Sequence, residues 1–113
     1  MLESLGYRAL ATSSGACAAT LGRRDGSVTR EEALTHCRQI VQATSLPVAG
    51  DLENGVGAEP AGVMETSRLA AAAGLVGGSS EDSPGNKEKP QSDLSCGMER
   101  IAAAVSAARA LPV

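Results

Sequence analysis

Three short apolar runs alternate with longer amphipathic segments along this chain. The short runs have the length of single strands and lie near residues 7–12, 47–51 and 75–80. Elsewhere, apolar residues recur every three or four positions, which predicts helices near residues 30–44, 60–73 and 94–110. Alternating strands and helices are typical of a parallel sheet with helical crossovers. The pattern therefore predicts an α/β fold, without separating an open sheet from a barrel.

Local signals mark the ends of these predicted helices. Thr29 and Glu32 have the spacing of a capping box, Pro60 suits a first helical position, and Gly74 suits the end of a helix. The first residues read as the last turn of a helix that ends at Gly6, so we expect an earlier strand and most of its helix to be missing. Ser13–Gly15 is followed by an alanine-rich stretch that we interpret as a turn through Gly22.

The last predicted helix carries an apolar stripe that needs a sheet beneath it: Leu94, Met98, Ile101, Val105 and Ala108. Residues 83–93, before it, are rich in Pro, Gly, Ser, Asn and Lys and predict a mobile loop. The 113 residues include no Trp or Phe and one Tyr, so an isolated core would bury little area. We therefore expect residues 1–113 to be a single partial domain of about three βα units within a larger layered structure.

Charge and composition exclude several classes of partner. The net charge of −3, with no block of Lys and Arg, gives no electrostatic basis for binding nucleic acid. No apolar stretch reaches the ~20 residues that span a bilayer, and no signal peptide is recognisable, so we expect a cytoplasmic protein without membrane contact. Three widely spaced cysteines, Cys17, Cys37 and Cys96, predict reduced thiols used for packing.

Acidic residues follow two of the predicted strands directly. Asp51 and Glu53 come after the run at 47–51, and Glu81 comes after the run at 75–80. Because the ends of neighbouring parallel strands meet at one edge of a sheet, these carboxylates can converge there. Hard oxygen ligands at a partly hydrated site favour Mg²⁺ or Mn²⁺. The competing interpretation is that they are helix caps or solvated turn residues.

Four further positions are candidates for chemistry. Ser14 and Gly15 follow the first strand and can hold a carboxylate or phosphate, although such a turn is also ordinary loop chemistry. Asp25 can act as a ligand or general acid or base, but Asp-Gly is also a frequent turn pair. Lys87 lies in the predicted mobile loop and can close over an anion, or can simply keep that loop solvated.

Four ordered motifs resemble the isocitrate lyase and phosphoenolpyruvate mutase superfamily, and the phosphonomutase-like branch most closely. They are Ala9–Gly15 (ALATSSG), Leu21–Gly26 (LGRRDG), Leu46–Gly55 (LPVAGDLENG) and Ala73–Asp82 (AGLVGGSSED). The resemblance implies a TIM-type (β/α)8 barrel of about 250 residues. It also implies an Mg²⁺-dependent enzyme that cleaves or forms a C–C or P–C bond of a small oxo- or hydroxy-carboxylate or a phosphonate.

The same resemblance implies residue roles. Asp51, Glu53 and Glu81 correspond to metal-site acids, Ser14 and Gly15 to the substrate carboxylate clamp, and Asp25 to a catalytic acid. The chain departs from the family where Glu53 replaces a common Asp. The lyases' loop cysteine, flanked by Lys and His, has no counterpart after Glu81, which argues against a true isocitrate or methylisocitrate lyase.

Two alternatives to an enzyme stay open. One is a truncated, inactive chain that is unstable alone or associates with a partner, a homo-oligomer included, because an open barrel leaves unpaired strand edges. The other is a small ligand-binding module with an α/β sheet.

Overall fold

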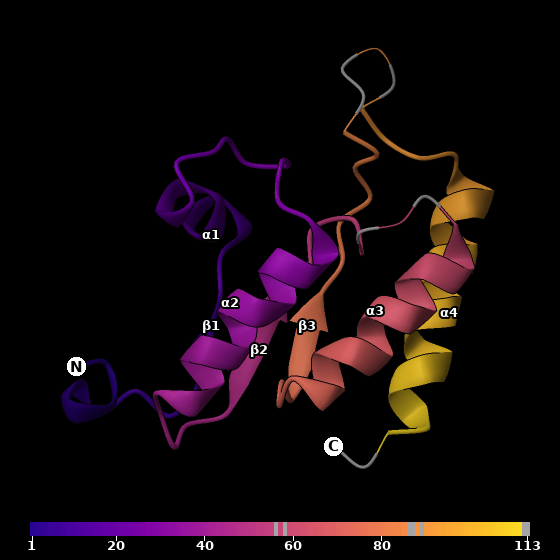
Figure 1. The fold of residues 1–113 in the computed structure, drawn as a ribbon. Coiled ribbons are helices and arrows are strands. Elements are labelled where there is room, and N and C mark those ends of the chain that lie inside the picture. Colours follow the sequence, from indigo (N-terminus) through magenta and orange to yellow (C-terminus); the bar gives the residue numbers. More distant parts are fainter. Residues whose placement is uncertain (56, 58, 86–87, 89, 112–113) are drawn as a thin grey trace.

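A parallel three-stranded sheet in the order β1-β2-β3 lies at the centre of the chain (Figure 1). The computed structural model describes residues 1–55, 57, 59–85, 88 and 90–111. In chain order, the elements are η1 (Glu3–Leu5), β1 (Leu10–Ala11), α1 (Ser14–Thr20), α2 (Arg30–Gln42), β2 (Val48–Asp51), α3 (Pro60–Ala72), β3 (Gly77–Ser79) and α4 (Leu94–Arg109). Each of the three strands is shorter than the apolar run that predicts it.

Strand register determines which residues share a face of the sheet. Leu10 pairs with Val48, Ala49 pairs with Gly77, and Asp51 pairs with Ser79. Because side chains alternate along a strand, Val48 and Gly50 share one face while Ala49 and Asp51 share the other. Val48 and Gly50 are buried, whereas Ala49 and Asp51 are partly exposed. The acidic residue at the end of β2 therefore belongs to the less covered face.

Helices α2 and α3 cover the buried face of the sheet (Figure 1). The core between them joins side chains from both helices, from β2 and the residue after it, and from the segment before β3: Leu34, Cys37, Val48, Leu52, Ala70 and Leu75. A side chain at Gly50 would not fit, since a Cβ there would lie 2.6 Å from Cδ1 of the buried Leu75. Packing of small residues against leucine thus brings the helices close to the sheet.

The residues that the sequence marks as helix ends lie at the ends of α2 and α3. The Thr29 hydroxyl accepts from the Glu32 amide while the Glu32 carboxylate accepts from the Thr29 amide, which is a complete capping box. Pro60 opens α3, and Gly74 follows it with a φ of +92° beside Val41. Gly6 also has a left-handed conformation, but the turn before it is the short 3₁₀ helix η1.

The alanine-rich stretch after β1 is a helix, so the predicted turn there is wrong. Helix α1 begins after Ser13, whose hydroxyl accepts from the Ala16 amide at 3.3 Å. Cys17 and Ala18 bury one side of it against Val28. Alanine has the highest helix propensity, and a serine cap satisfies an exposed amide, so local preference and packing agree.

Helix α4 packs on α3 rather than on the sheet (Figure 1). Its predicted apolar stripe is exposed: the exposed fraction is 64% for Met98, 49% for Ile101 and 42% for Val105. Arg100 and Ala107, on another face of the helix, are buried instead. The sheet expected beneath the stripe is therefore not among the described residues.

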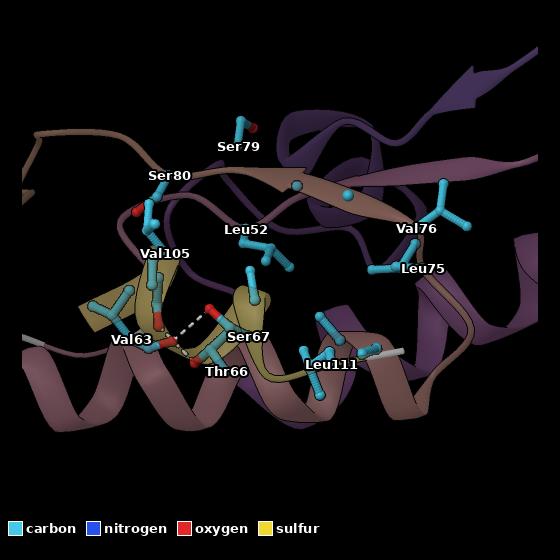
Figure 2. Close-up of a pocket in the computed structure, with 17 residues that line it drawn as sticks. Leu52, Val63, Thr66, Ser67, Leu75, Val76, Ser79, Ser80, Val105 and Leu111 are labelled. Atoms are coloured by element: carbon cyan, nitrogen blue, oxygen red, sulfur yellow. Dashed lines mark hydrogen bonds between the residues drawn. The ribbon is translucent and has the colours of Figure 1, made fainter. Parts of the chain in front are cut away.

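A mainly apolar pocket of about 230 Å³ lies where β3, α3 and α4 meet (Figure 2). Leu52, Val63, Leu75 and Val105 are among the side chains that line it. Thr66 closes one part of it by donating to the Gly55 carbonyl at 2.7 Å. Across the described part of the chain, no helix combines the length and apolarity required to cross a bilayer.

Candidate metal and substrate site

The loops that follow β2 and β3 run side by side at the carboxyl end of the sheet. The Leu52 amide donates to the Ser79 carbonyl at 3.3 Å, and the Glu81 amide donates to the Glu53 carbonyl at 2.6 Å. Parallel pairing therefore extends beyond the strands into the acidic segments. This backbone arrangement brings Glu53 and Glu81, which are far apart in the sequence, to the same edge.

Asp51 uses its carboxylate to organise the surrounding backbone. Its Oδ2 accepts from the Ser14 amide at 2.9 Å and its Oδ1 accepts from the Glu53 amide at 3.2 Å. Its own amide donates to the Thr12 hydroxyl at 2.9 Å. Burial acts to raise the pKa of Asp51, but the hydrogen bonds from Ser14 and Glu53 outweigh it, so the pKa lies below its ordinary value. Asp51 is therefore held ionised and joins the ends of β1 and β2.

The pKa of Glu53 is shifted in the opposite direction from that of Asp51. Burial, followed by the negative charges of Asp25, Asp51 and Glu81, raises the pKa of its carboxyl. Its backbone has a φ of +50°, an uncommon left-handed conformation for a residue other than glycine. A strained backbone that places one carboxylate among three others is typical of a functional site.

A polar pocket of about 410 Å³ opens above these loops. It brings together four of the predicted site residues, Ser14, Asp25, Glu53 and Glu81, with Asn54 and the segment 83–85. Gly15 does not line the pocket but lies close to Asp25, since a Cβ built on it would be 3.5 Å from Oδ2 of that residue. Asp51 does not line the pocket and acts through the backbone of Ser14 and Glu53. Lys87 lies outside the described residues.

The oxygen atoms that line the pocket suit a hard cation that keeps part of its hydration shell. They suit less well a cation whose ligands all come from the protein. Among the residues that the structure describes, no three His, Cys, Asp or Glu side chains are close enough to hold one metal ion together. The mutual repulsion at Glu53 is nevertheless of the kind that a cation relieves. Mg²⁺ commonly keeps several waters and needs one or two carboxylates, so the wide pocket and its oxygen donors are compatible with that ion.

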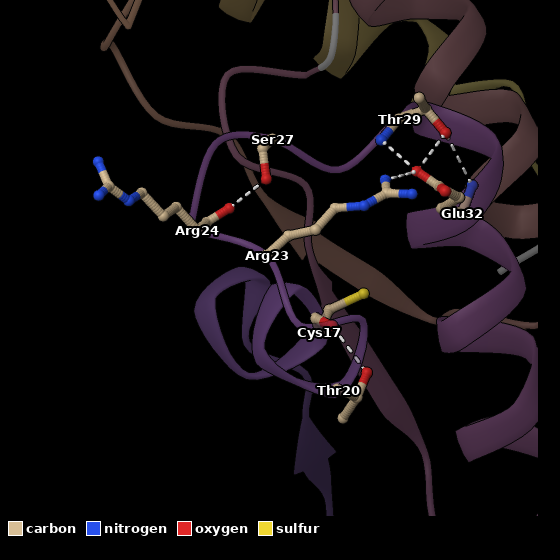
Figure 3. A network of polar contacts seen from close by, with 7 residues as sticks. All are labelled: Cys17, Thr20, Arg23, Arg24, Ser27, Thr29 and Glu32. Carbon is tan, nitrogen blue, oxygen red and sulfur yellow. Dashed lines mark hydrogen bonds and ion pairs between the residues drawn. The ribbon is translucent and has the colours of Figure 1, made fainter.

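A second polar network holds the loop that carries Asp25 (Figure 3). Arg23 pairs with Glu32 at 2.8 Å, and Ser27 donates to the Arg24 carbonyl. The amide of Thr29, then Arg23, lowers the pKa of Glu32 to about 2. Since Glu32 belongs to the first turn of α2, this network ties the Asp25 loop to that helix.

The three cysteines do not line the polar pocket. Cys17 and Cys37 are buried and free, and Cys96 is partly exposed and free. Burial raises the pKa of both the Cys17 and the Cys37 thiols, which disfavours the reactive thiolate. Packing is the role that the structure supports for these two residues.

The sequence patterns did not identify Arg100 as a residue that contacts the loops of the site. Its exposed fraction is 5%, and its guanidinium donates to the Asn54 carbonyl and, at 3.3 Å, to the Ser92 hydroxyl. The available signal was a second face of α4, made of small residues around one arginine: Cys96, Gly97, Ala104 and Ala107. The more hydrophobic stripe of the helix obscured that face.

The comparison with known families gives a match that covers all 113 residues of this chain. The family model described as phosphoenolpyruvate phosphomutase matches residues 1–113. No curated protein matches the chain.

Solved structures match nearly all of this chain. A protein classed as a lyase/mutase from Burkholderia cenocepacia J2315 is 50% identical, with a TM-score of 0.96 over 98% of this chain and 40% of its own. A 2,3-dimethylmalate lyase of the PEP mutase/isocitrate lyase superfamily is 29% identical, with a TM-score of 0.86 over 96% and 39%. A phosphonopyruvate hydrolase in complex with oxalate and Mg²⁺ is 22% identical, with a TM-score of 0.87 over 94% and 38%, and supports the fold alone.

The chain thus spans about 40% of the length of the structures that it matches. Its three parallel βα units form part of a barrel, which confirms the predicted α/β fold class and the resemblance drawn from the four motifs.

Proposed function

The chain belongs to the phosphoenolpyruvate phosphomutase family of lyases and mutases, and from this premise we propose that it carries the metal-binding part of such an active site. The reaction is the cleavage or formation of a C–C or P–C bond of a small oxo- or hydroxy-carboxylate or a phosphonate. The ligands that we propose, a small carboxylate and Mg²⁺, are of the same kinds as those in the phosphonopyruvate hydrolase complex, whose likeness to this chain shows the fold alone. A cytoplasmic location stays a prediction from the sequence.

One observation carries the proposal. Asp25, Glu53 and Glu81 line a single polar pocket at the carboxyl ends of parallel strands, and burial together with the neighbouring charges raises the pKa of Glu53. Such a cluster is costly unless a cation or a proton offsets it. Enzymes with parallel βα units bind their ligands at this end of the strands.

We assign Glu53, Glu81 and Asp51 to the cation, Mg²⁺ or Mn²⁺, with Asp51 acting chiefly by orienting the Glu53 backbone. A bound ion would supply positive charge beside the oxyanion of an enolate. Ser14 lines the pocket and is the proposed contact for the substrate carboxylate; both its amide and its hydroxyl also hydrogen-bond to Asp51. Asp25, which also lines the pocket, is the candidate proton carrier. Lys87 is proposed as a catalytic residue from its position in the sequence alone.

Calorimetry with the full chain tests this assignment. We expect MgCl₂ to bind, and sodium oxalate to bind more tightly when Mg²⁺ is present. Glu81→Gln should weaken Mg²⁺ binding by about tenfold or more, because a carboxylate at the cation is lost. Asp82→Asn is the matched control, since Asp82 is the next residue and carries the same charge but does not line the polar pocket.

Absence of Mg²⁺ binding in the unaltered chain would contradict the proposal, as would equal losses in both variants. Turnover of an oxo-carboxylate or phosphonate, abolished by Asp51→Ala, separates an enzyme from a ligand-binding module, which would bind oxalate without turnover.

The exposed stripe of α4 supports a second candidate. Met98, Ile101 and Val105 expose apolar area and line a hollow with Ser80, the residue after β3, and in the described part of the chain β3 pairs on one side only. A chain with these features can be catalytically inactive alone and act by associating with a partner that covers them.

A further inference from the structure

Arg100 is a buried cationic side chain that forms no ion pair within the described ranges. It projects from α4, and its guanidinium donates to the Asn54 carbonyl and the Ser92 hydroxyl. Its Nε has no hydrogen-bond partner. Burying a charge is costly, so a side chain held in this way needs a reason beyond filling space between two helices.

The carbonyl that Arg100 contacts belongs to the loop of the polar pocket. Asn54 follows Glu53, whose left-handed backbone is the strained point of that loop. The loop is also held by three other hydrogen bonds: the Glu53 amide donates to Asp51, the Glu81 amide donates to the Glu53 carbonyl, and the Thr66 hydroxyl donates to the Gly55 carbonyl. Arg100 adds a contact to this loop from α4.

Helix α4 also lies against the second acidic segment. A Cβ built on Gly97 would be 3.3 Å from Oδ1 of Asp82, so the helix backbone approaches the residue after Glu81 closely. Gly97 and Arg100 are three residues apart and share a face of the helix. The two acidic loops thus meet the same face of α4.

Given the function proposed above, on which this inference rests, we propose that Arg100 is a positioning residue for the carboxylate cluster. It holds the Asn54 carbonyl, and this contact keeps the backbone of Glu53 in the conformation that presents its carboxylate to the polar pocket. Arg100 itself touches neither cation nor substrate. Docking of α4 is thereby coupled to the geometry of the cation site.

Amide hydrogen exchange in the metal-free chain tests the coupling without reference to activity. In Arg100→Gln, the amides of Glu53 and Glu81 should exchange about tenfold faster, the factor expected for the loss of one charge-assisted hydrogen bond. The amides of Leu10 and Thr12, which pair β1 with β2, should keep their rates. Arg109→Gln is the matched control, because Arg109 is exposed at the end of the same helix.

Calorimetry supplies the second readout. We expect the dissociation constant for Mg²⁺ to rise about tenfold in Arg100→Gln and to stay unchanged in Arg109→Gln. If the unaltered chain does not bind Mg²⁺, the proposed function fails, and the exchange rates still decide whether Arg100 positions the loop.

A uniform increase across all amides would overturn the inference, since it would show only global destabilisation. Unchanged rates at Glu53 and Glu81 would overturn it as well. If Arg100→Gln does not fold, Arg100→Lys replaces it: the lysine keeps the charge but loses the planar fork, and faster exchange confined to the same two amides supports the role.

Discussion

At the scale of single residues, Glu53 is the position where electrostatics and backbone strain coincide. Burial and the charges of Asp25, Asp51 and Glu81 raise the pKa of its carboxyl above the ordinary value. A raised pKa means that the folded chain disfavours the ionised form. The metal-free chain therefore loses stability as pH rises from the ordinary pKa through the raised one, and this cost is present at neutral pH.

Glu53→Gln should consequently raise the melting temperature of the metal-free chain at pH 7. The gain should fade at pH 4, where the native carboxyl is largely protonated. Thermal unfolding followed by circular dichroism, in the presence of a chelator, measures both values. Glu99→Gln, an exposed acid on α4, serves as the control and should have little effect. A lower melting temperature for Glu53→Gln at pH 7 would show that the cluster is not under electrostatic stress.

The sequence predicted that the acidic segments lie together because its signals are local. Asp51, Glu53 and Glu81 follow apolar runs, and parallel pairing brings their segments together, as the Glu81 to Glu53 hydrogen bond shows. Which of these three carboxylates faces the pocket was not predictable from the sequence. Whether a carboxylate faces a pocket or accepts from the amides of Ser14 and Glu53 depends on three-dimensional geometry, and Asp51 does the latter.

At the scale of elements, helix ends were easier to predict than helix faces. Capping at Thr29, Pro60 and Gly74 depends on a few adjacent residues, so its signals are visible in the sequence. Helix α1 was missed because seven residues are too few to show periodicity. The face of α4 that packs was also missed, because a stripe of large apolar residues outweighs a face of small ones in any hydrophobic pattern, while contact with α3 requires the small ones.

The ion pair between Arg23 and Glu32, which joins the Asp25 loop to α2, predicts how the stability of the chain depends on pH. The Thr29 amide and Arg23 lower the pKa of Glu32 to about 2, so the ionised form contributes stability that is present above the ordinary pKa. This contribution should be lost as pH falls from about 4.5 to about 2.

We therefore expect Glu32→Gln to melt at a lower temperature than the unaltered chain at pH 7, with the difference closing over that range of pH. The effect should be small and weaker in high salt, because the pair is exposed. Glu31→Gln, which removes a neighbouring acid of the same helix turn, should show a smaller difference. A difference that does not change with pH would mean that the network does not favour the charged carboxylate.

At the scale of the whole molecule, the exposed surfaces are as informative as the core. Among the described residues, β1 and β3 each pair with a strand on one side only, and the apolar side chains of Met98, Ile101 and Val105 on α4 are exposed. Exposed strand edges and contiguous apolar side chains promote association. The related structures, in which the matching segment is about 40% of the chain, show that this unit exists within larger folds.

The 113-residue chain alone should therefore sediment as a species larger than its 11.3 kDa monomer. Ile101→Glu places a charge in the middle of the stripe and should shift the distribution toward monomer, since desolvating that carboxylate opposes burial of the stripe. Ser106→Glu adds the same charge at an exposed position away from the stripe, and should leave the distribution unchanged. Sedimentation velocity at several concentrations measures the three chains. If the unaltered chain is a compact monomer at every concentration, the stripe does not drive association, and the second candidate function loses its support.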